Sequence, residues 1–291
     1  MMSFKSIIRA FLFLSTLAVS LQPSCSQNET TEADLEIVEP SWLLMTRIPP
    51  SYSKDLVADF EALTSGLEFP EHLMAEDAEK AEGDFEVSLY FAVLDRLSMR
   101  GGRVLDWVYN YAGIGGAPVL YARKSVETPY RNYTEYLAAG EASAGEAKRE
   151  DYYLRFISTD GSSEGFFQLV LLHIQGEQFY QFWHAAYNDD RIVSDLEDAR
   201  AILTSPTSST GLTGWVGEEN ATVEGLLEEL AGIDLAPVVS MSPDEVKVEV
   251  VVFTKWGGFI RRTMIMEEDY PHLILEERDE VLVPYDCGIM F

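Results

Sequence analysis

The stretch 246-VKVEVVVFTKWGGFIRRTMIM-266 decides the fold class of this 291-residue chain. Its two strand-like runs, Val246–Thr254 and Phe259–Met266, flank the short turn Trp256-Gly257-Gly258, a pattern that predicts a β-hairpin. A second hairpin is predicted upstream, where Val104–Tyr111 and Pro118–Arg123 flank the glycine-rich turn 112–116. Antiparallel pairing is therefore expected in two separate regions of the chain.

Three more strands are predicted between these hairpins, at Tyr152–Ser158, Phe166–Gln175 and Gln178–Tyr187, and they form an antiparallel meander. Two short runs, His272–Glu276 and Glu280–Val283, close the chain. Apolar spacing predicts helices at 53–67, 70–81, 85–99, 134–149, 191–203 and 222–230, although the aromatic content of 85–99 also suits a strand. Because strands and helices do not alternate, we expect one α+β domain, with an antiparallel sheet and peripheral helices.

The N-terminus has the pattern of a secretory leader. Lys5 and Arg9 precede the apolar stretch 10–21. That stretch is shorter than the roughly 20 residues needed to cross a bilayer. We therefore predict a signal peptide at 1–24, a linker or tether at 25–50 and an acidic α+β domain at 51–291. Within the linker, Trp42–Met45 is too apolar for a free tether and is expected to dock as a strand or staple.

Two processing sites compete after the apolar stretch. Ala18-Val19-Ser20 suits ordinary cleavage and free secretion. Leu21-Gln22-Pro23-Ser24-Cys25 instead resembles the lipobox of bacterial lipoproteins, which implies a diacylated Cys25 as the first mature residue and attachment to a membrane. The second cysteine, Cys287, is then a lone thiol. Without acylation, a Cys25–Cys287 bridge is the alternative.

The charge of the chain limits its partners. The formal net charge is −28, and the leader carries the two positive charges of Lys5 and Arg9, so the mature chain is near −30. Such a field repels nucleic acid and anionic lipid headgroups, and it attracts cationic ligands or basic proteins. Solubility or adaptation to high salt is the alternative explanation for the same charge.

The densest cluster of polar and aromatic residues lies at the end of the predicted strand 178–187. His184 beside Asp189 and Asp190 could serve acid–base chemistry, and Trp183 and Tyr187 are candidate binding aromatics. In the alternative interpretation, Asp189 and Asp190 cap the helix predicted from Arg191, and the aromatic side chains belong to the core.

No other motif predicts a cofactor or a metal. The segment 160–165 begins like a calcium loop, but its twelfth position is Leu171 instead of glutamate. Gly113–Pro118 lacks the spacing of a dinucleotide fingerprint. His173 is expected on a strand within the sheet, and Cys287 has no basic neighbour that could stabilise a thiolate.

These observations favour an exported, lipid-anchored envelope protein that binds a ligand or partner and catalyses no reaction. The alternative is a hydrolase or metal-dependent enzyme that uses His184, Asp189 and Asp190 and is closed by the loop 204–213.

Overall fold

The computed structural model describes residues 42–140, 150–183, 185, 190–204, 222–255 and 257–285. The chain divides into Met1–Ser41, which lies outside the described residues, and Trp42–Phe291. Helices and mostly antiparallel strands have about equal shares in the second unit, which confirms the predicted α+β fold class.

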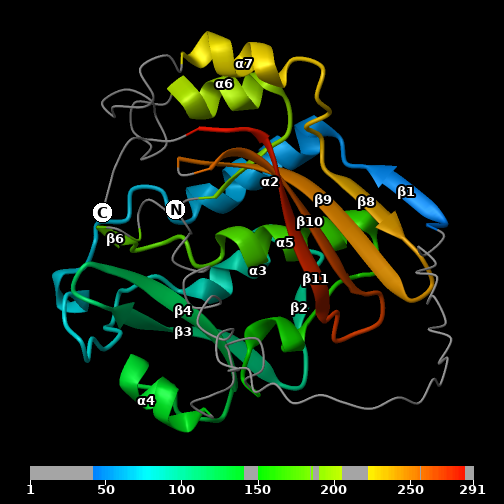
Figure 1. Cartoon of the computed structure of the whole chain (residues 1–291). Coiled ribbons are helices and arrows are strands. Elements are labelled where there is room, and N and C mark those ends of the chain that lie inside the picture. The colour runs from blue at the N-terminus through cyan, green and yellow to red at the C-terminus, as the bar shows by residue number, and fades with distance from the viewer. Residues whose placement is uncertain are drawn as a thin grey trace, which may run out of the picture. The chain divides into compact units, whose positions relative to one another are not determined.

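The largest sheet has six antiparallel strands in the order β1-β8-β9-β10-β11, with β7 also paired to β9 (Figure 1). Its centre is the predicted hairpin, in which Val252 pairs with Ile260 and Val248 with Met264. The alternating side chains of β9 and β10 present one apolar face to each side of the sheet. The strand bounds are β1 (Leu44–Arg47), β7 (Arg191–Val193), β8 (Val238–Met241), β9 (Glu245–Thr254), β10 (Gly258–Glu267) and β11 (Ile274–Val283).

The second predicted hairpin is also confirmed. Strands β3 (Arg103–Tyr111) and β4 (Gly115–Lys124) pair along their whole length, and the short β6 (Phe182–Trp183) joins the start of β4. A two-stranded pair, β2 (Ser98–Met99) with β5 (Ile157–Ser158), lies apart from these sheets.

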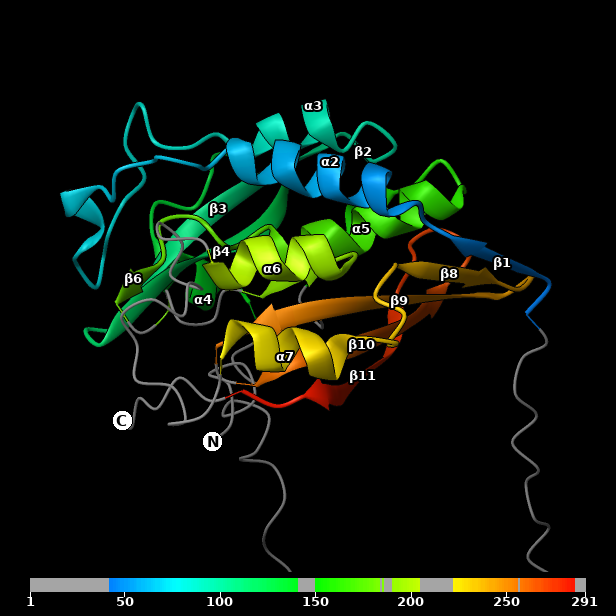
Figure 2. The same ribbon diagram turned by 90° about the horizontal axis from the view of Figure 1, so that it is seen from above.

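The predicted strand Phe166–Gln175 is wrong, because these residues belong to helix α5 (Ser163–Gln175). Seven of the ten residues in this run are apolar, and a short apolar run suits a buried strand and a buried helix equally well. The Ser162 side chain accepts a hydrogen bond from the Gly165 backbone N–H and caps the helix. Helix α5 lies between the large sheet and the β3–β4 hairpin (Figure 2), where tertiary contacts surround it.

The antiparallel meander predicted from 152–158, 166–175 and 178–187 is therefore also wrong. The region predicted as strand 152–158 forms a 3₁₀ turn at Tyr153–Phe156 followed by β5, and the strand predicted at 178–187 is reduced to β6 in the described residues. The segment 159–165 leads into a helix instead of joining two strands. The helix predicted at 191–203 begins as β7 and becomes α6 (Leu196–Thr204) only afterwards.

The remaining helices are shorter than the apolar spacing predicts. Helix α7 (Val223–Leu230) matches its prediction closely, whereas α2 (Pro50–Ala62) begins three residues and ends five residues before the predicted range 53–67. The regions 70–81 and 85–99 contain only 3₁₀ turns at Glu71–Leu73 and Val87–Leu89 and the single turn α3 (Tyr90–Val93). Helix α4 (Tyr133–Ala139) covers the start of the region predicted at 134–149, and 141–149 lies outside the described residues.

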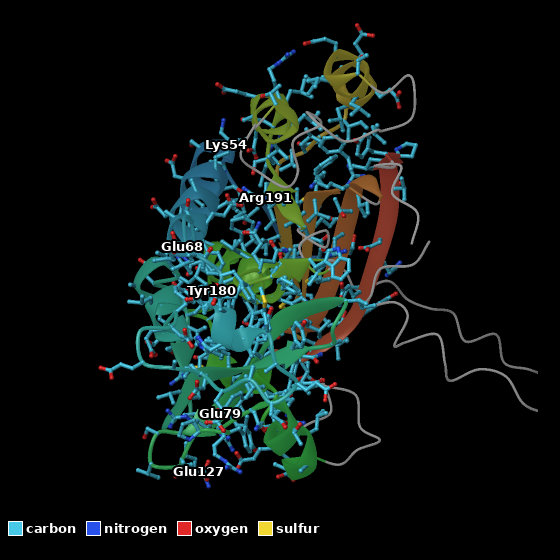
Figure 3. The ribbon with its side chains drawn as sticks, turned by 90° about the vertical axis from the view of Figure 1, so that its left-hand side faces the viewer. Lys54, Glu68, Glu79, Glu127, Tyr180 and Arg191 are labelled. Atoms are coloured by element: carbon cyan, nitrogen blue, oxygen red, sulfur yellow. The ribbon has the colours of Figure 1, made fainter. Side chains whose placement is uncertain are left out.

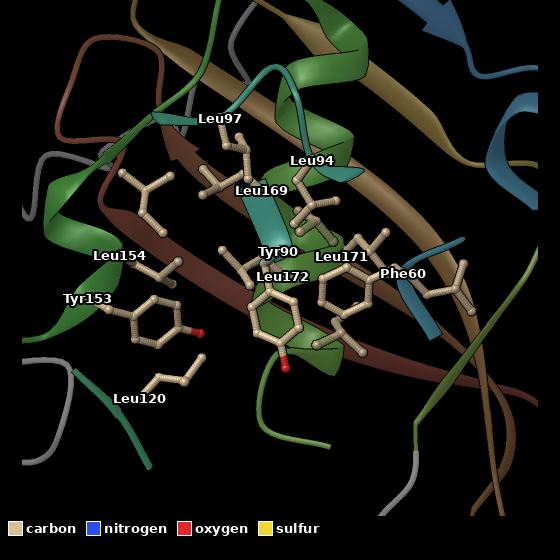
Figure 4. Packing of buried hydrophobic residues seen from close by; sticks show 14 of the residues in the cluster. Phe60, Tyr90, Leu94, Leu97, Leu120, Tyr153, Leu154, Leu169, Leu171 and Leu172 are labelled. Atoms are coloured by element: carbon tan, nitrogen blue, oxygen red, sulfur yellow. The ribbon is translucent and has the colours of Figure 1, made fainter. Parts of the chain in front are cut away.

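Three apolar clusters hold the described part of the domain together, and two of them include residues of the large sheet. The main core packs α5 against the inner face of the large sheet, α2 and the β3–β4 hairpin, and Figure 4 shows Leu169, Leu171 and Leu172 of α5 beside Phe60 and Tyr90. On the opposite face of the sheet, α6 and α7 cover Val251, Phe253 and Phe259.

The residues predicted as a linker, 25–50, contain β1 and the first residue of α2. Among the described helices, none combines the length and apolar character that crossing a membrane requires.

Candidate functional site

The predicted strand-end cluster is partly visible. Strand β6 holds Trp183 at one end of the β3–β4 hairpin, and Asp190 directly precedes β7. Three of the predicted residues lie outside the described residues: His184, Tyr187 and Asp189. The predicted acid–base group of His184, Asp189 and Asp190 is therefore untested.

Asp190 is held from several sides. Its carboxylate accepts a hydrogen bond from Arg262 at 2.7 Å, and its backbone carbonyl accepts from the side chains of Gln175 at 3.2 Å and Gln178 at 3.1 Å. These bonds fix the point at which the chain enters β7. Asp190 thus serves as an acceptor for groups on α5 and β10.

The helix-capping role predicted for Asp190 is wrong. A strand follows it, and the next helix begins six residues later at Leu196. There the Asp195 side chain accepts a hydrogen bond from the Asp198 N–H at 2.8 Å. The pairing of β7 with β9 overrides the helical spacing of the sequence, because it buries Ile192 and Val193 in the sheet.

Arg262 is the centre of a carboxylate cluster. It donates two hydrogen bonds to Asp279, both of 2.9 Å, and its guanidinium lies 3.6 Å from Glu277. Burial by itself lowers the pKa of this guanidinium, but the hydrogen bonds to Asp279 and the charge of Asp190 raise it above its ordinary value. The cation therefore stays charged while its side chain is only 14% exposed.

His173 joins the same cluster from α5 instead of from a strand. Its ring Nε2 lies 3.5 Å from the Glu277 carboxylate, and both side chains are mostly buried. The structure thus brings His173 and Asp190 to one cluster through Arg262 and Glu277, a grouping that the sequence did not predict. Because Arg262 holds the carboxylates, we interpret the cluster as a structural link between α5, β10 and β11.

Trp183 is an exposed aromatic residue of the predicted site. Its side chain is 54% exposed, and its backbone has a φ of +49°. Tyr180, three residues earlier, has a φ of +47°. Positive φ is costly for residues other than glycine, and it persists only where surrounding contacts enforce it.

Those contacts come from the core. The Tyr109 hydroxyl donates to the Tyr180 carbonyl at 2.8 Å, and the Phe85 backbone N–H donates to the Tyr180 hydroxyl at 3.2 Å. The start of β4 must also be glycine, because a Cβ on Gly116 would collide with the Tyr109 ring. The segment that presents Trp183 is therefore fixed from both sides.

Aromatic side chains pack around Phe182, the residue before Trp183. The Phe182 ring lies 5.1 Å from Phe69 and 5.9 Å from Tyr111, measured between ring centroids. These distances are typical of favourable aromatic pairs. We call Phe69, Tyr111, Phe182 and Trp183 the aromatic patch.

Phe69 also connects the patch to an acidic loop, residues 68–86. This loop contains eight acidic residues and one lysine, and all of its acidic side chains except Asp84 lie on exposed residues. Figure 3 shows Glu68, Tyr180 and Glu79 following one another along this side of the domain. The acidic loop therefore begins at the aromatic patch and continues the same surface.

The acidic loop is held in place by buried groups. Leu73 and Ala78 point into the core, and Lys80 donates to Asp106 of β3 at 2.5 Å. His72 Nε2 lies 3.0 Å from the Asp84 carboxylate, which is 6% exposed and also accepts from the Ala81 N–H. The sequence analysis predicts a helix at 70–81 and does not single out this loop. The density of acidic residues between 68 and 86 is the sequence feature that could have indicated an exposed acidic surface.

A shallow groove of about 600 Å³ lies elsewhere, between the starts of α2 and α6 and the loop 232–235. Arg47 pairs with Asp234 at 2.6 Å, and Lys54 at the start of α2 pairs with Asp195 at 2.8 Å. Charges of both signs are thus paired around this groove.

Metal ligands do not gather within the described residues, where no group of three or more histidine, cysteine, aspartate or glutamate side chains has a suitable arrangement. Asp160, the first residue of the calcium-like segment, accepts from Ser162 and Arg96 instead and supports the start of α5.

Comparison with known proteins gives no relative: no family model, no curated protein and no solved structure matches the chain.

Proposed function

We propose that this chain is an exported, lipid-anchored binding protein whose folded domain recognises a basic partner. The observation that carries the proposal is the exposed Trp183, held on a constrained backbone next to Phe182, whose ring packs on Phe69 at the start of the acidic loop. Binding aromatics are commonly presented in this way by a rigid scaffold. The domain acts through association, without a catalytic step of its own.

The chemistry of the surface selects the partner. The acidic loop attracts Lys- and Arg-rich segments over a distance of roughly 8–10 Å in physiological salt. The indole face of Trp183 then favours a guanidinium or ammonium group, and such a contact contributes about 0.5–1 kcal/mol at an exposed site. Together the two features support a basic protein segment or a cationic ligand as the occupant.

Export and anchoring are supported by the leader and by Cys25. We expect the native protein to begin at Cys25 with added acyl mass and to partition into detergent. Cys25→Ala should lose both properties. Intact mass and detergent partitioning of the two proteins test this, and cleavage after Ser20 without acyl mass would replace the anchor with free secretion.

The Trp183 prediction uses an eight-residue oligoarginine peptide as the probe. Trp183→Leu keeps apolar bulk but removes the aromatic face, so we expect about two- to sixfold weaker binding with unchanged stability. Fluorescence anisotropy of labelled peptide measures the affinity, and binding should weaken as sodium chloride rises. Equal affinity of the two proteins would exclude Trp183 from the site.

A charge-matched pair of variants tests the acidic loop. Glu76, Glu79 and Glu82 are exposed in the loop, and changing all three to glutamine should weaken peptide binding more than Trp183→Leu does. The control changes three exposed acids elsewhere to amides: Glu228, Glu229 and Asp244. If both triple variants lose the same affinity, only net charge matters, and the site proposal fails.

A further inference from the structure

Three consecutive apolar side chains protrude at the start of the folded domain. Leu43 is 73% exposed, Leu44 is 53% exposed and Met45 is 68% exposed. Single exposed apolar residues are ordinary on protein surfaces, whereas contiguous ones mark an interaction site. We call these three residues the apolar ridge.

The backbone of the apolar ridge is firmly held while its side chains remain in solvent. The Leu43 N–H donates to the Met241 carbonyl at 2.9 Å, and Leu44 and Met45 pair with β8. The Trp42 ring lies 5.6 Å from the Lys247 ammonium group and borders the ridge. Aromatic and lysine side chains beside apolar residues are typical of groups placed at a membrane–water interface.

The ridge and the proposed binding surface lie at opposite ends of the domain. Figures 1 and 2 both place β1 at one end of the long axis of the sheet and β6 with the neighbouring acidic loop at the other. A surface that contacts the ridge therefore leaves Trp183 and the acidic loop directed away from it.

We infer that the apolar ridge rests on the lipid surface to which Cys25 anchors the chain. This inference depends on the anchoring part of the proposed function. Trp42 follows Cys25 by seventeen residues, which span at most about 60 Å when fully extended. An anchor within that reach keeps the ridge at a high local concentration near the bilayer, so a modest apolar contact suffices to orient the domain.

The charge near the ridge restricts the type of lipid. Asp244 precedes β9, Glu245 begins β9 and Glu267 ends β10, at the end of the sheet where Leu44 and Met241 pair. Glu268 and Asp269 follow directly. Carboxylates at this end oppose anionic headgroups. The expected surface is therefore zwitterionic, and the contact weakens as anionic lipid is added.

The test holds the chain from Cys25 onward on phosphatidylcholine vesicles through an N-terminal hexahistidine tag and nickel-chelating lipid. Brominated phosphatidylcholine quenches tryptophans that enter the interface. We expect part of the emission to be quenched in the wild type and this part to disappear in Trp42→Phe. Leu43→Glu should weaken the contact by about tenfold or more, because the variant no longer transfers a leucine side chain from water into the lipid interface.

Ile114→Glu is the matched control, because Ile114 is 56% exposed in the hairpin turn at the β6 end. It should leave the quenching unchanged. Quenching that survives Trp42→Phe, or equal effects of Leu43→Glu and Ile114→Glu, would overturn the inference. The tag replaces the acyl chain, so the ridge is tested separately: a missing acyl group on the native protein contradicts the proposed anchor, whereas missing Trp42 quenching contradicts the ridge.

Discussion

Asp106→Asn is expected to lower the free energy of unfolding by about 3 kcal/mol, the low end for breaking a buried ion pair. The Asp106 side chain is 4% exposed and accepts hydrogen bonds from Lys80 at 2.5 Å and Arg123 at 2.7 Å. The amide keeps the shape but leaves two cations without a counter-charge. Because Lys80 and Arg123 are each about a quarter exposed, water offsets part of the loss.

Urea unfolding measures this change. Glu127→Gln is the control, since that exposed carboxylate pairs with Lys124 and should give no measurable loss. An Asp106→Asn midpoint equal to that of the control would contradict the structural role. Because Lys80 belongs to the acidic loop, oligoarginine binding should also weaken in Asp106→Asn if the loop shifts.

Lowering the pH should weaken the same interaction and reduce the stability of the fold. Burial by itself raises the pKa of the Asp106 carboxyl, but hydrogen bonds from Lys80 and Arg123 hold it below its ordinary value. A carboxyl with a depressed pKa stabilises the folded state above its unfolded pKa of about 3.9, and this contribution is lost as the pH falls further. Below about pH 4, the stability of the wild type should therefore fall more steeply than that of Asp106→Asn.

Arg262→Gln is expected to cost about 3–5 kcal/mol of unfolding free energy. The guanidinium is only 14% exposed, and it is the cation between Asp190, Glu277 and Asp279. Its removal leaves three carboxylates close together at the junction of β7, β10 and β11. Sodium chloride should recover part of the loss, because it screens their repulsion.

Two variants sharpen this second prediction. Arg262→Lys keeps the charge but loses the planar fork that binds Asp279 through two hydrogen bonds, so its stability should lie between wild type and Arg262→Gln. Arg278→Gln removes an exposed arginine from neighbouring β11 and should change little. Equal unfolding midpoints for Arg262→Gln and Arg278→Gln would show that the cluster does not stabilise the fold.

The candidate site was only partly predictable. The sequence analysis predicts Trp183 as a candidate binding aromatic, and the structure places this residue on an exposed, constrained segment. It did not identify the acidic loop as the adjoining surface, because Phe69 and Phe182 are far apart in the chain and meet only in the fold. The sequence could not predict the Arg262 cluster either, since its members come from four separate places: α5, the residue that precedes β7, strand β10 and strand β11.

What the sequence by itself determined is the α+β class and its two long hairpins. Only three residues separate β3 from β4, between Tyr111 and Gly115, and three separate β9 from β10, between Thr254 and Gly258. Strands with such short connections pair locally and leave a periodic pattern in the sequence. The tertiary structure alone decided the state of α5 and β7. The mostly apolar run 166–175 suits both helix and strand, and the choice depends on burial between the large sheet and the β3–β4 hairpin. Residues 191–193 pair with β9, more than fifty residues away, and that long-range pairing overrides their helical spacing.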